Sequence, residues 1–434
     1  MDTVDIAIVA AFVVAYAIVS ARLSTTVITG PIVFVSFGLI VGPEALDVVD
    51  LSLDNEVVRT LAELTLILVL YTDASRIDIR VLRHSSQIPL RLLVLGLPLT
   101  IALGAGFGAL LFDGLDLWEV ALLAAVLAPT DAALGQAVVT NTRVPVRIRQ
   151  ALNVESGLND GIAVPFIVFF VAGAAATEEL QSTGFWIEFA LKQIGFGLLV
   201  GTGVGLAGAW LVERSTHRGW IGHSFQRLAI VAIAVLAFAL AESIDGNGFI
   251  AAFIAGLSVG NVTRHHKGKL LDFSEQEGEL LALLTFMIFG GAFLGAALDE
   301  LTWRIALYAV LSLSIIRFVP VAVSLIGMRL QRDTVAFLGW FGPRGLASIV
   351  FGLLVLETTE IAGREEIFLV AVWTILLSVV AHGLTAQPGA RWYGARAEAM
   401  AEEPGMPEMV EVEELPVRAR PLSQKGARAF SSRE

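Results

Sequence analysis

Long apolar stretches recur along most of the chain and are separated by short polar segments. A helix that crosses a bilayer needs about 20 mostly apolar residues, and by that measure the sequence holds roughly thirteen candidates. Their centres lie near Val13, Val33, Ile67, Gly104, Pro129, Val164, Gly201, Ile233, Ile254, Met287, Ser314, Gly345 and Thr374. The pattern predicts an all-α polytopic membrane protein with about 13 transmembrane helices.

The segments between these stretches alternate in charge. One set is basic and includes Arg80, Arg147 and Arg218, whereas the other is acidic and includes Asp116 and Glu300. Basic loops stay in the cytoplasm, and an odd number of spans places the two termini on opposite sides. We therefore expect a multi-pass protein of the cell (inner) membrane, with the N-terminus outside and the C-terminus in the cytoplasm.

The composition supports this class and excludes others. Of 434 residues, 56% are hydrophobic and only 16% are charged, whereas about 25% are charged in a typical soluble protein. The net charge of -12 argues against nucleic acid as a partner, and no cofactor is expected because Cys is absent and His lacks metal-site spacing. We predict a membrane domain at residues 1–386 and a disordered cytoplasmic tail at 387–434.

Polar residues interrupt one apolar stretch, from Val154 to Pro165, at Glu155, Ser156, Asn159 and Asp160. On a helix, residues four apart lie on the same side, so these four side chains share one polar arc. Gly157 and Gly161 would lie beside that arc and allow close approach of another element. An ionisable group inside a bilayer costs free energy unless a partner compensates it, so such a group is rarely there without a function, and we interpret this arc as the site of a small cation.

Two further stretches carry a proline next to a charged residue: Leu127-Ala-Pro-Thr-Asp131 and Trp340-Phe-Gly-Pro-Arg-Gly345. Proline removes a helical hydrogen bond, so both helices are expected to break there. Thr130 and Asp131 would cap a second half-helix, and Arg344 would neutralise the carbonyl end of a first one. The breaks fall in spans five and twelve of the predicted order, which indicates an inverted repeat; a pair of ordinary proline kinks is the alternative.

A third buried charge, Arg317, needs an acidic partner at its depth in the membrane. Glu155 is the natural candidate for this ion pair. If Asp131 caps its half-helix, Asp160 is the carboxylate that remains for a transported ion.

These residues together resemble the electroneutral branch of the monovalent cation/proton antiporters, the NhaP and NHE type. The resemblance runs over most of Val4 to Thr385 and rests on Ala128-Pro-Thr-Asp131, Asn159-Asp160, Arg317 and Gly342-Pro-Arg-Gly345. It implies a NhaA/NhaP-like antiporter fold, in which inverted repeats contain two broken, crossing helices. The core ion-binding bundle would include residues 118–176 and 302–386, next to a dimerisation bundle, so a homodimer is expected.

The resemblance also implies roles for single residues. Asp160 would bind the cation and the proton in turn, close to Thr130 (through its backbone carbonyl), Asp131, Glu155 and Ser156. The carboxylates of Asp160 and Asp131 would be the main ligands of the transported cation. Asn159 would organise the site, and Glu155 and Arg317 would form a structural ion pair. Asp73 resembles an acidic position near the cytoplasmic entrance that could modulate access or pH response.

Competition for one buried carboxylate would give exchange without a further coupling device, because burial disfavours the charged form and either ion can neutralise it. We expect electroneutral one-for-one exchange of Na+ for H+ across the bilayer, as in pH homeostasis. Li+ and K+ are further candidate ions, and a K+/H+ antiporter with the same mechanism is the alternative.

Two other classes share some of these features. An intramembrane aspartyl protease also places two aspartates in the membrane, here Asp131 and Asp160, but its Tyr-Asp and Gly-x-Gly-Asp motifs are missing. A transporter of organic anions could share broken helices and inverted repeats, but its half-helix N-termini should face the substrate without an added carboxylate.

Overall fold

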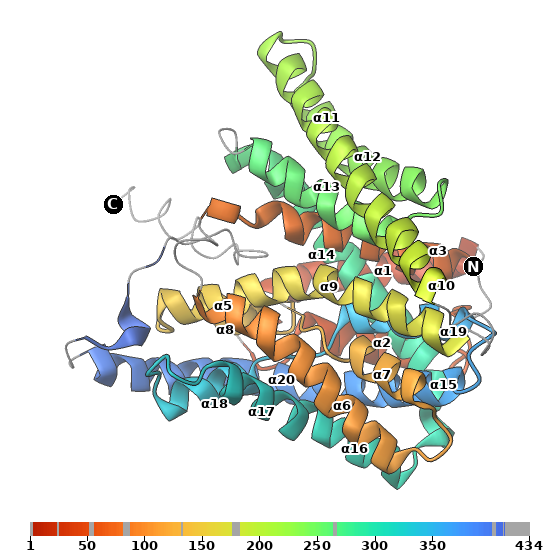
Figure 1. Cartoon of the computed structure of the whole chain (residues 1–434), viewed down its shortest axis with the longest axis vertical. Helices are drawn as coiled ribbons and strands as arrows, with labels where there is room; N and C mark the ends of the chain where they lie inside the picture. Colours follow the sequence, from red (N-terminus) through yellow and green to blue (C-terminus); the bar gives the residue numbers. More distant parts are fainter. Residues whose placement is uncertain are drawn as a thin grey trace.

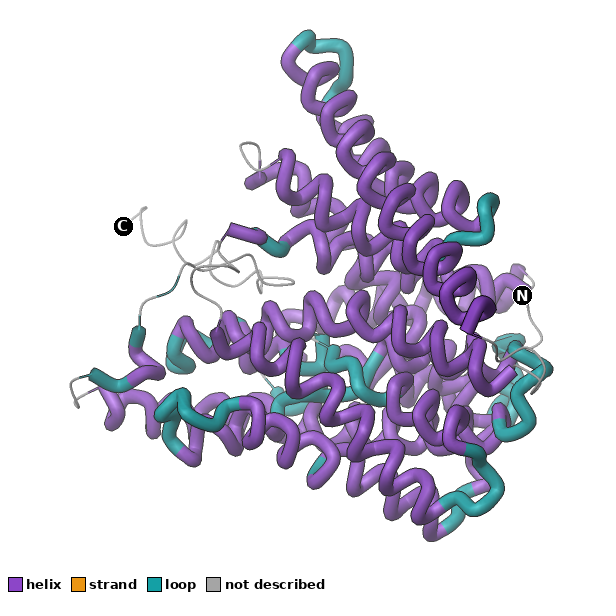
Figure 2. Tube along the Cα trace, viewed as in Figure 1, coloured by secondary structure: helices purple, strands orange, loops and turns teal. Residues whose placement is uncertain are grey.

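The computed structural model describes residues 3–23, 26–51, 56–80, 87–131, 133–175, 183–263, 267–401, 405–410 and 412. All regular elements in these ranges are helical (Figures 1 and 2). The elements are α1 (Thr3–Leu23), α2 (Gly30–Val41), α3 (Glu56–Arg76), α5 (Gln87–Arg91), η1 (Leu92–Gly96), α6 (Leu97–Leu111), α7 (Leu117–Val126), α8 (Gln136–Val139), α9 (Val146–Ala175), α10 (Thr183–Phe189), η3 (Ala190–Phe196), α11 (Gly197–His217), α12 (His223–Glu242), α13 (Gly248–Val262), α14 (Lys267–Ile288), η5 (Phe289–Leu294), α15 (Gly295–Ala297), η6 (Leu298–Glu300), α16 (Trp303–Leu313), α17 (Ile315–Ser324), α18 (Arg332–Trp340), α19 (Leu346–Glu357), α20 (Arg364–Ala401) and η7 (Pro407–Met409).

The first bundle contains α1–α3 and α11–α14. In it α13 packs against α3, α11 and α12, and α14 packs against α2 and α3. Glycine makes the closest of these contacts possible. A Cβ at Gly256 would lie 2.1 Å from the carbonyl oxygen of Tyr71, and one at Gly260 would lie 1.9 Å from that of Ser75. The backbones of α13 and α3 therefore touch directly, as small residues allow in membrane helices.

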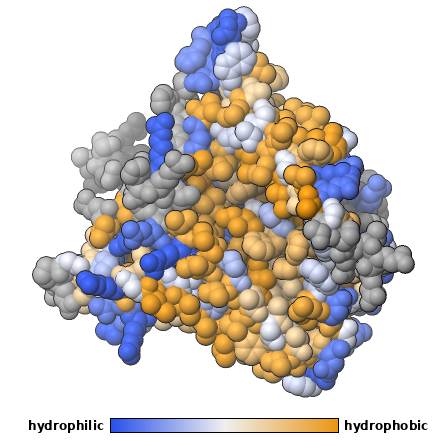
Figure 3. Space-filling view, viewed as in Figure 1, coloured by the Kyte–Doolittle hydropathy of each residue, from blue (hydrophilic) through white to orange (hydrophobic). Residues whose placement is uncertain are grey.

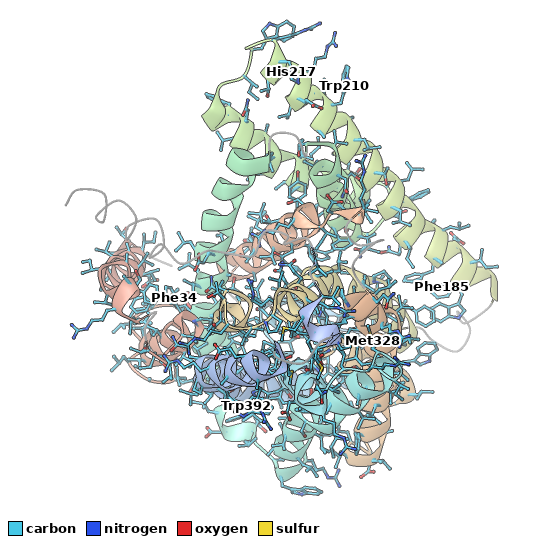
Figure 4. The ribbon with its side chains drawn as sticks, turned by 90° about the vertical axis from the view of Figure 1, so that its left-hand side faces the viewer. Phe34, Phe185, Trp210, His217, Met328 and Trp392 are labelled. Atoms are coloured by element: carbon cyan, nitrogen blue, oxygen red, sulfur yellow. The ribbon has the colours of Figure 1, made fainter. Side chains whose placement is uncertain are left out.

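One end of α11 and the start of α12 extend beyond the other helices (Figure 1). Figure 4 places Trp210 and His217 at this end of α11, well away from Trp392 on α20. The guanidinium of Arg214 lies 5.4 Å from the Trp210 ring centre, within the range of cation–π attraction. An exposed tryptophan next to arginine is typical of a membrane–water boundary.

The second bundle contains α5–α9 and α16–α20. Both halves of this bundle follow the same order. An apolar segment (α5, η1 and α6, or α16 and α17) precedes a pair of short helices (α7 and α8, or α18 and α19), and a long helix (α9 or α20) follows. This order matches the inverted repeat predicted from the spacing of the two prolines. Helix α9, which carries the polar arc of Glu155 to Asp160, lies at the edge of the bundle, because it packs against α7 and also against α3 and α13 of the first bundle.

The surface is that of a multi-pass membrane protein. Within the described residues, seven helices are long and apolar enough to cross a membrane, and five shorter apolar helices accompany them. Hydrophobic residues cover the middle of the face seen in Figure 3, and hydrophilic ones gather toward helix ends, as at the α11–α12 turn.

The predicted span centres all fall within helices or at breaks between them, but the total of thirteen stays a prediction. One predicted span is not a continuous helix. The stretch centred near Ser314 consists of two helices, α16 and α17, and Ser314 lies between them at φ -114° and ψ -100°. This bend lies three residues before Arg317.

The tail prediction is wrong for residues 387–401. Helix α20 continues through Pro388 to Ala401, and Tyr393 is fully buried, with its ring stacked 4.1 Å from that of Phe337. Residues 405–410 are also described and include the short helix η7, whereas residues 413–434 lie outside the described part. Hydrophobicity falls after Pro388 because only one side of this helical extension is buried.

Candidate functional site

The first helix break follows α7. This helix ends at Val126, residues 128–131 have no regular structure, and the chain turns into the short helix α8. Pro129 has no N–H to continue the helix. The carbonyl group of Val126 accepts a hydrogen bond of 2.7 Å from the hydroxyl of Ser348 on α19. A side chain of α19 therefore provides a hydrogen-bond donor for a backbone carbonyl at the C-terminal end of α7.

The second break lies between α18 and α19. Helix α18 ends at Trp340, residues 341–345 are irregular around Pro343, and α19 begins at Leu346. Both breaks are thus where the prolines predicted them. The alternative of two simple proline kinks is wrong, because several consecutive residues leave the helix at each site.

The charged residue of each break serves the other break. The Asp131 side chain accepts a hydrogen bond of 2.9 Å from the backbone N–H of Leu346, the first residue of α19. The Arg344 guanidinium donates to the carbonyl groups of Ala128 at 2.7 Å and Pro129 at 3.3 Å. A third bond of 2.8 Å joins the Asp131 N–H to the Pro343 carbonyl. The two broken helices therefore cross at these irregular segments.

This exchange of partners corrects part of the sequence interpretation. Asp131 does not start a second half-helix of its own, because residues 133–135 form turns and its second oxygen accepts from the Ala133 N–H at 2.7 Å. Arg344 does neutralise a carbonyl end, but that of the first break rather than of α18. As predicted, the negative side chain lies at a helix N-terminus and the positive one at free carbonyl groups. Only the break that each side chain serves differs from the prediction. Gly345 permits this, since a Cβ there would lie 2.2 Å from the Asp131 carboxylate.

The polar arc of α9 faces the first break. The hydroxyl of Thr130 lies 3.2 Å from that of Ser156 and accepts a 2.6 Å hydrogen bond from the Asn159 side-chain amide. All three residues are buried, as is Asp160 at 7% exposure. The structure thus brings together Thr130, Ser156 and Asn159 as the sequence predicted.

Asp160 lies at the border between the two bundles. Successive residues are about 100° apart around a helix axis, so Asp160 falls between the side of Ser156 and Asn159 and the side of Gly157 and Gly161. The first side faces Thr130. On the second side, a Cβ at Gly161 would lie 2.1 Å from the Phe253 ring of α13. Asp160 is therefore beside the crossing and beside the interface with the first bundle.

The predicted ion pair is present. Arg317 Nη1 lies 2.6 Å from Glu155 Oε1, and the side chains are 4% and 3% exposed. A Cβ at Gly342 would lie 2.4 Å from Arg317 Nε, so glycine leaves room for the guanidinium beside the second break. The pair connects α9 to α17 and satisfies a buried charge on each helix.

Asp73 lies on the other side of α9. Its Cβ is 4.0 Å from the position of a Cβ on Gly157, and its carboxylate is 3.5 Å from Arg76 Nη1, with both side chains buried. Asp73 belongs to α3 of the first bundle, so the structure brings it near α9 but onto the face opposite Glu155.

Three side chains of this region were not predicted from the sequence: Ser348, Ser378 and His382. His382 is 1% exposed and its ring contacts the Trp340 carbonyl, and Ser378 accepts a hydrogen bond from the Arg344 N–H. The available signal was a histidine in the middle of an apolar stretch, where an ionisable residue indicates function or a buried partner.

The ligand types at the crossing are hydroxyl, amide, carbonyl and carboxylate oxygens. In the described part of the chain, three or more His, Cys, Asp or Glu side chains nowhere gather as they would around a bound metal. Oxygen ligands suit hard cations, and the transported ion would be a substrate rather than a resident metal.

Comparisons with known proteins agree with this geometry. The family model described as "Sodium/hydrogen exchanger, transmembrane" matches residues 8–392. The chain is 24% identical over 433 residues to the K(+)/H(+) antiporter NhaP2 of Shewanella sp. (strain ANA-3), covering 99% of this chain and 70% of that protein. It is 27% identical over 357 residues to the Na(+)/H(+) antiporter ApNhaP of Aphanothece halophytica, covering 78% and 66%.

The fold is also similar to solved structures of the sodium proton antiporter MjNhaP1 from Methanocaldococcus jannaschii. The structure at pH 8 gives a TM-score of 0.69 over 86% of this chain and 92% of that chain, at 19% identity. The electron microscopy structure gives 0.74 over 93% and 99%, also at 19% identity. The match to the family model extends over most of the chain, and this protein belongs to the transmembrane sodium/hydrogen exchanger family.

Proposed function

We propose that this protein exchanges a monovalent cation for protons across the membrane by alternating access. The observation that carries the proposal is the position of Asp160, a buried carboxylate beside the crossed helix breaks and at the interface of the two bundles. A small movement between the bundles would expose such a group to one side of the membrane and then to the other. Family membership supports this function and disfavours the aspartyl protease.

Asp160 would carry either a cation or a proton. Burial disfavours a charged carboxylate, so each ion neutralises it and excludes the other. One positive charge then crosses in each direction, and exchange is one-for-one and electroneutral. Asn159 is important here, because a second carboxylate at that position would favour unequal stoichiometry.

The residues around Asp160 would have distinct roles. Thr130, through its carbonyl oxygen, and Ser156 would complete the coordination of the cation, together with Asp131. Asn159 would hold Thr130 in place, as its 2.6 Å hydrogen bond suggests. Glu155 and Arg317 would keep α9 in register with α17, and Arg344 would neutralise the carbonyl end of the first break. Asp73, on α3, would modulate access from the cytoplasm.

Na+ and Li+ are the proposed cations, with K+ as the alternative. The relatives support both choices, because one is named a K(+)/H(+) antiporter (NhaP2) and another a Na(+)/H(+) antiporter (ApNhaP). Exchange of either ion would contribute to pH homeostasis.

The test is proton movement in proteoliposomes that contain a pH-sensitive dye. Pulses of Na+, Li+ and K+ should change the internal pH of vesicles with the wild-type protein. Asp160→Asn should abolish the response while the protein remains folded. Asp113→Asn is the matched control, because Asp113 is 78% exposed in its ion pair with Arg304, and it should retain exchange. Exchange by Asp160→Asn would show that the site lies elsewhere.

Stoichiometry has its own measurement. If exchange is one-for-one, an imposed membrane potential leaves the initial rate unchanged within error. A rate that changes severalfold with potential would rule out electroneutral exchange, although antiport itself would stand.

We also propose an inner-membrane location, an N-terminus outside, a cytoplasmic C-terminus and a homodimer formed through the first bundle. The chain has no Cys, so single cysteines can report on topology. A membrane-impermeant maleimide should label Glu300→Cys in intact cells, and Arg218→Cys only after permeabilisation. The reverse pattern would invert the topology. Cross-linking in membranes tests the dimer.

A further inference from the structure

Helix α20 holds the second break through two buried side chains, Ser378 and His382. Ser378 is 0% and His382 is 1% exposed. The Arg344 backbone N–H donates to Ser378 Oγ at 2.7 Å, and Ser378 Oγ lies 3.1 Å from His382 Nδ1. His382 Nε2 lies 2.8 Å from the carbonyl oxygen of Trp340. These contacts form a continuous chain from Arg344, inside the irregular segment, to Trp340, the residue just before it.

The acceptor at Trp340 assigns a hydrogen to Nε2 of the imidazole ring. A carbonyl oxygen can only accept, so Nε2 carries the hydrogen that reaches Trp340. Ser378 Oγ accepts from Arg344, and its own hydrogen is free to point at Nδ1. Nδ1 also lies 3.0 Å from the Ser378 carbonyl oxygen. A doubly protonated ring would turn its Nδ1–H to that carbonyl and leave the Ser378 hydroxyl without this acceptor. The neutral ring with hydrogen on Nε2 makes the bonds to Trp340 and to Ser378 Oγ but none to the Ser378 carbonyl, so the bond from Nε2 to Trp340 is the one that both states share.

The segment held in this way is the one that contacts the first break. Arg344 Nη1 donates to the Ala128 carbonyl, and the Pro343 carbonyl accepts from the Asp131 N–H. Thr130 lies between these two contact points and bonds Ser156 and Asn159 of α9. Movement of residues 341–345 would therefore move the proposed cation ligands.

We infer that His382 is a positioning residue for the cation site: through Ser378 it bridges the second break and fixes Pro343 and Arg344 where they hold residues 128–131. This inference rests on the proposed function. His382 itself does not touch the ion, so its loss should weaken cation binding more than it slows turnover.

Two replacements of His382 separate hydrogen bonding from packing. Gln can place an amide N–H near the position of Nε2, whereas Met has similar length and no donor, and both residues form helices well. Ser378→Ala removes the middle of the chain. Thr385→Val is the matched control, because Thr385 also lies on α20 and accepts a 2.9 Å bond from Trp340, but from its indole N–H rather than its carbonyl.

The measurement is exchange in proteoliposomes as a function of Na+, Li+ or K+ concentration. Loss of one net hydrogen bond should raise the cation KM about fivefold in His382→Met and Ser378→Ala, with kcat changed less than KM. His382→Gln and Thr385→Val should keep a KM close to wild type. An unchanged KM in His382→Met, or equal impairment of Gln and Met, would overturn the inference, as would a Thr385→Val variant impaired like His382→Met.

A second readout keeps this test separate from that of the proposed function. The midpoint of cation-dependent thermal stabilisation, measured on the detergent-solubilised proteins, should shift in the same order as KM. If wild type shows no exchange, the proposed function fails, and these midpoints still decide on His382. If wild type exchanges ions and the midpoints of all variants coincide, only the positioning role is wrong.

Discussion

Arg317 and Glu155 illustrate how much one buried residue can contribute to this molecule. Their ion pair of 2.6 Å is almost completely shielded from solvent, with side chains 4% and 3% exposed. Arg317→Ala leaves the Glu155 carboxylate buried without its arginine, so we expect the free energy of unfolding to fall by about 3–5 kcal/mol. Thermal unfolding in detergent measures the effect.

The control for this prediction is an ion pair of similar length at the surface. Lys192 lies 2.8 Å from Glu188, but the side chains are 44% and 66% exposed. Lys192→Ala should unfold at a temperature close to that of wild type, because an exposed ion pair contributes little to stability. A similar loss of stability in the two variants would mean that burial does not strengthen the contribution of the Arg317 pair.

Gly345 offers a second test at the residue scale. A Cβ at this position would lie 2.2 Å from the Asp131 carboxylate, which caps α19. Gly345→Ala should displace Asp131, abolish exchange and cost about 1–3 kcal/mol through overpacking. Gly352→Ala on the same helix should be tolerated, because a Cβ there meets Ala371 at an ordinary 3.7 Å. Normal exchange by Gly345→Ala would contradict this prediction.

Single residues could be predicted from the sequence where charge interrupts an apolar stretch. Glu155, Asp131, Arg317 and Arg344 were found in this way, because a buried charge needs a reason. Their partners were harder to predict. Asp131 and Arg344 serve each other's helix breaks, which depends on the crossing of two segments more than 200 residues apart along the chain. Sequence spacing carries no information on that crossing.

At the scale of helices, proline predicted the breaks at Pro129 and Pro343, but composition was misleading after Pro388, where it predicted a disordered tail. Helix α20 continues through Pro388, since the helical extension packs one side against α18 through Tyr393 and Phe337. The residues at the breaks are held by hydrogen bonds from other helices, whereas tertiary packing favours continued helix after Pro388. Tertiary contacts of this kind decide whether proline ends a helix, and the sequence does not reveal them.

The short segment around η7 contacts the start of α18, so we expect residues beyond α20 to stabilise α18. Glu408 is 0% exposed and accepts hydrogen bonds from the Gln331 N–H at 2.7 Å and the Thr334 hydroxyl at 2.9 Å. Gln331 is the residue before α18, so Glu408 places a carboxylate at the positive end of this helix. Glu408→Ala should lower the free energy of unfolding by about 1–3 kcal/mol, because the buried donors lose their acceptor.

Glu398→Ala is the control for Glu408, because Glu398 lies on the exposed side of α20. Its thermal unfolding should match wild type. A truncated chain that ends after Ala401 should be destabilised at least as much as Glu408→Ala, whereas one that ends after residue 412 should not. If the two truncated chains unfold alike, residues 405–410 do not contribute to the stability of α18.

At the scale of the whole molecule, the two bundles meet at the proposed cation site. Helix α9 contacts α3 near Gly157 and α13 at Gly161, and its other side faces the helix breaks. The sequence predicted the inverted repeat from the order of the two breaks, but it could not predict this interface, since residue patterns do not show which bundle faces which side of a helix. The proposed alternating access through Asp160 requires this interface to move.

That requirement can be tested by locking the interface with a disulfide. A Cβ at Gly157 would lie 4.0 Å from the Cβ of Asp73, and disulfides form at Cβ separations of about 3.5–4.5 Å. The chain contains no Cys, so Asp73→Cys with Gly157→Cys introduces the only pair. Oxidation should stop exchange, and reduction should restore the rate of the reduced double variant, with each single variant insensitive to oxidant. Full exchange by the oxidised, cross-linked protein would show that α3 and α9 stay together during transport, and the moving boundary would then lie elsewhere.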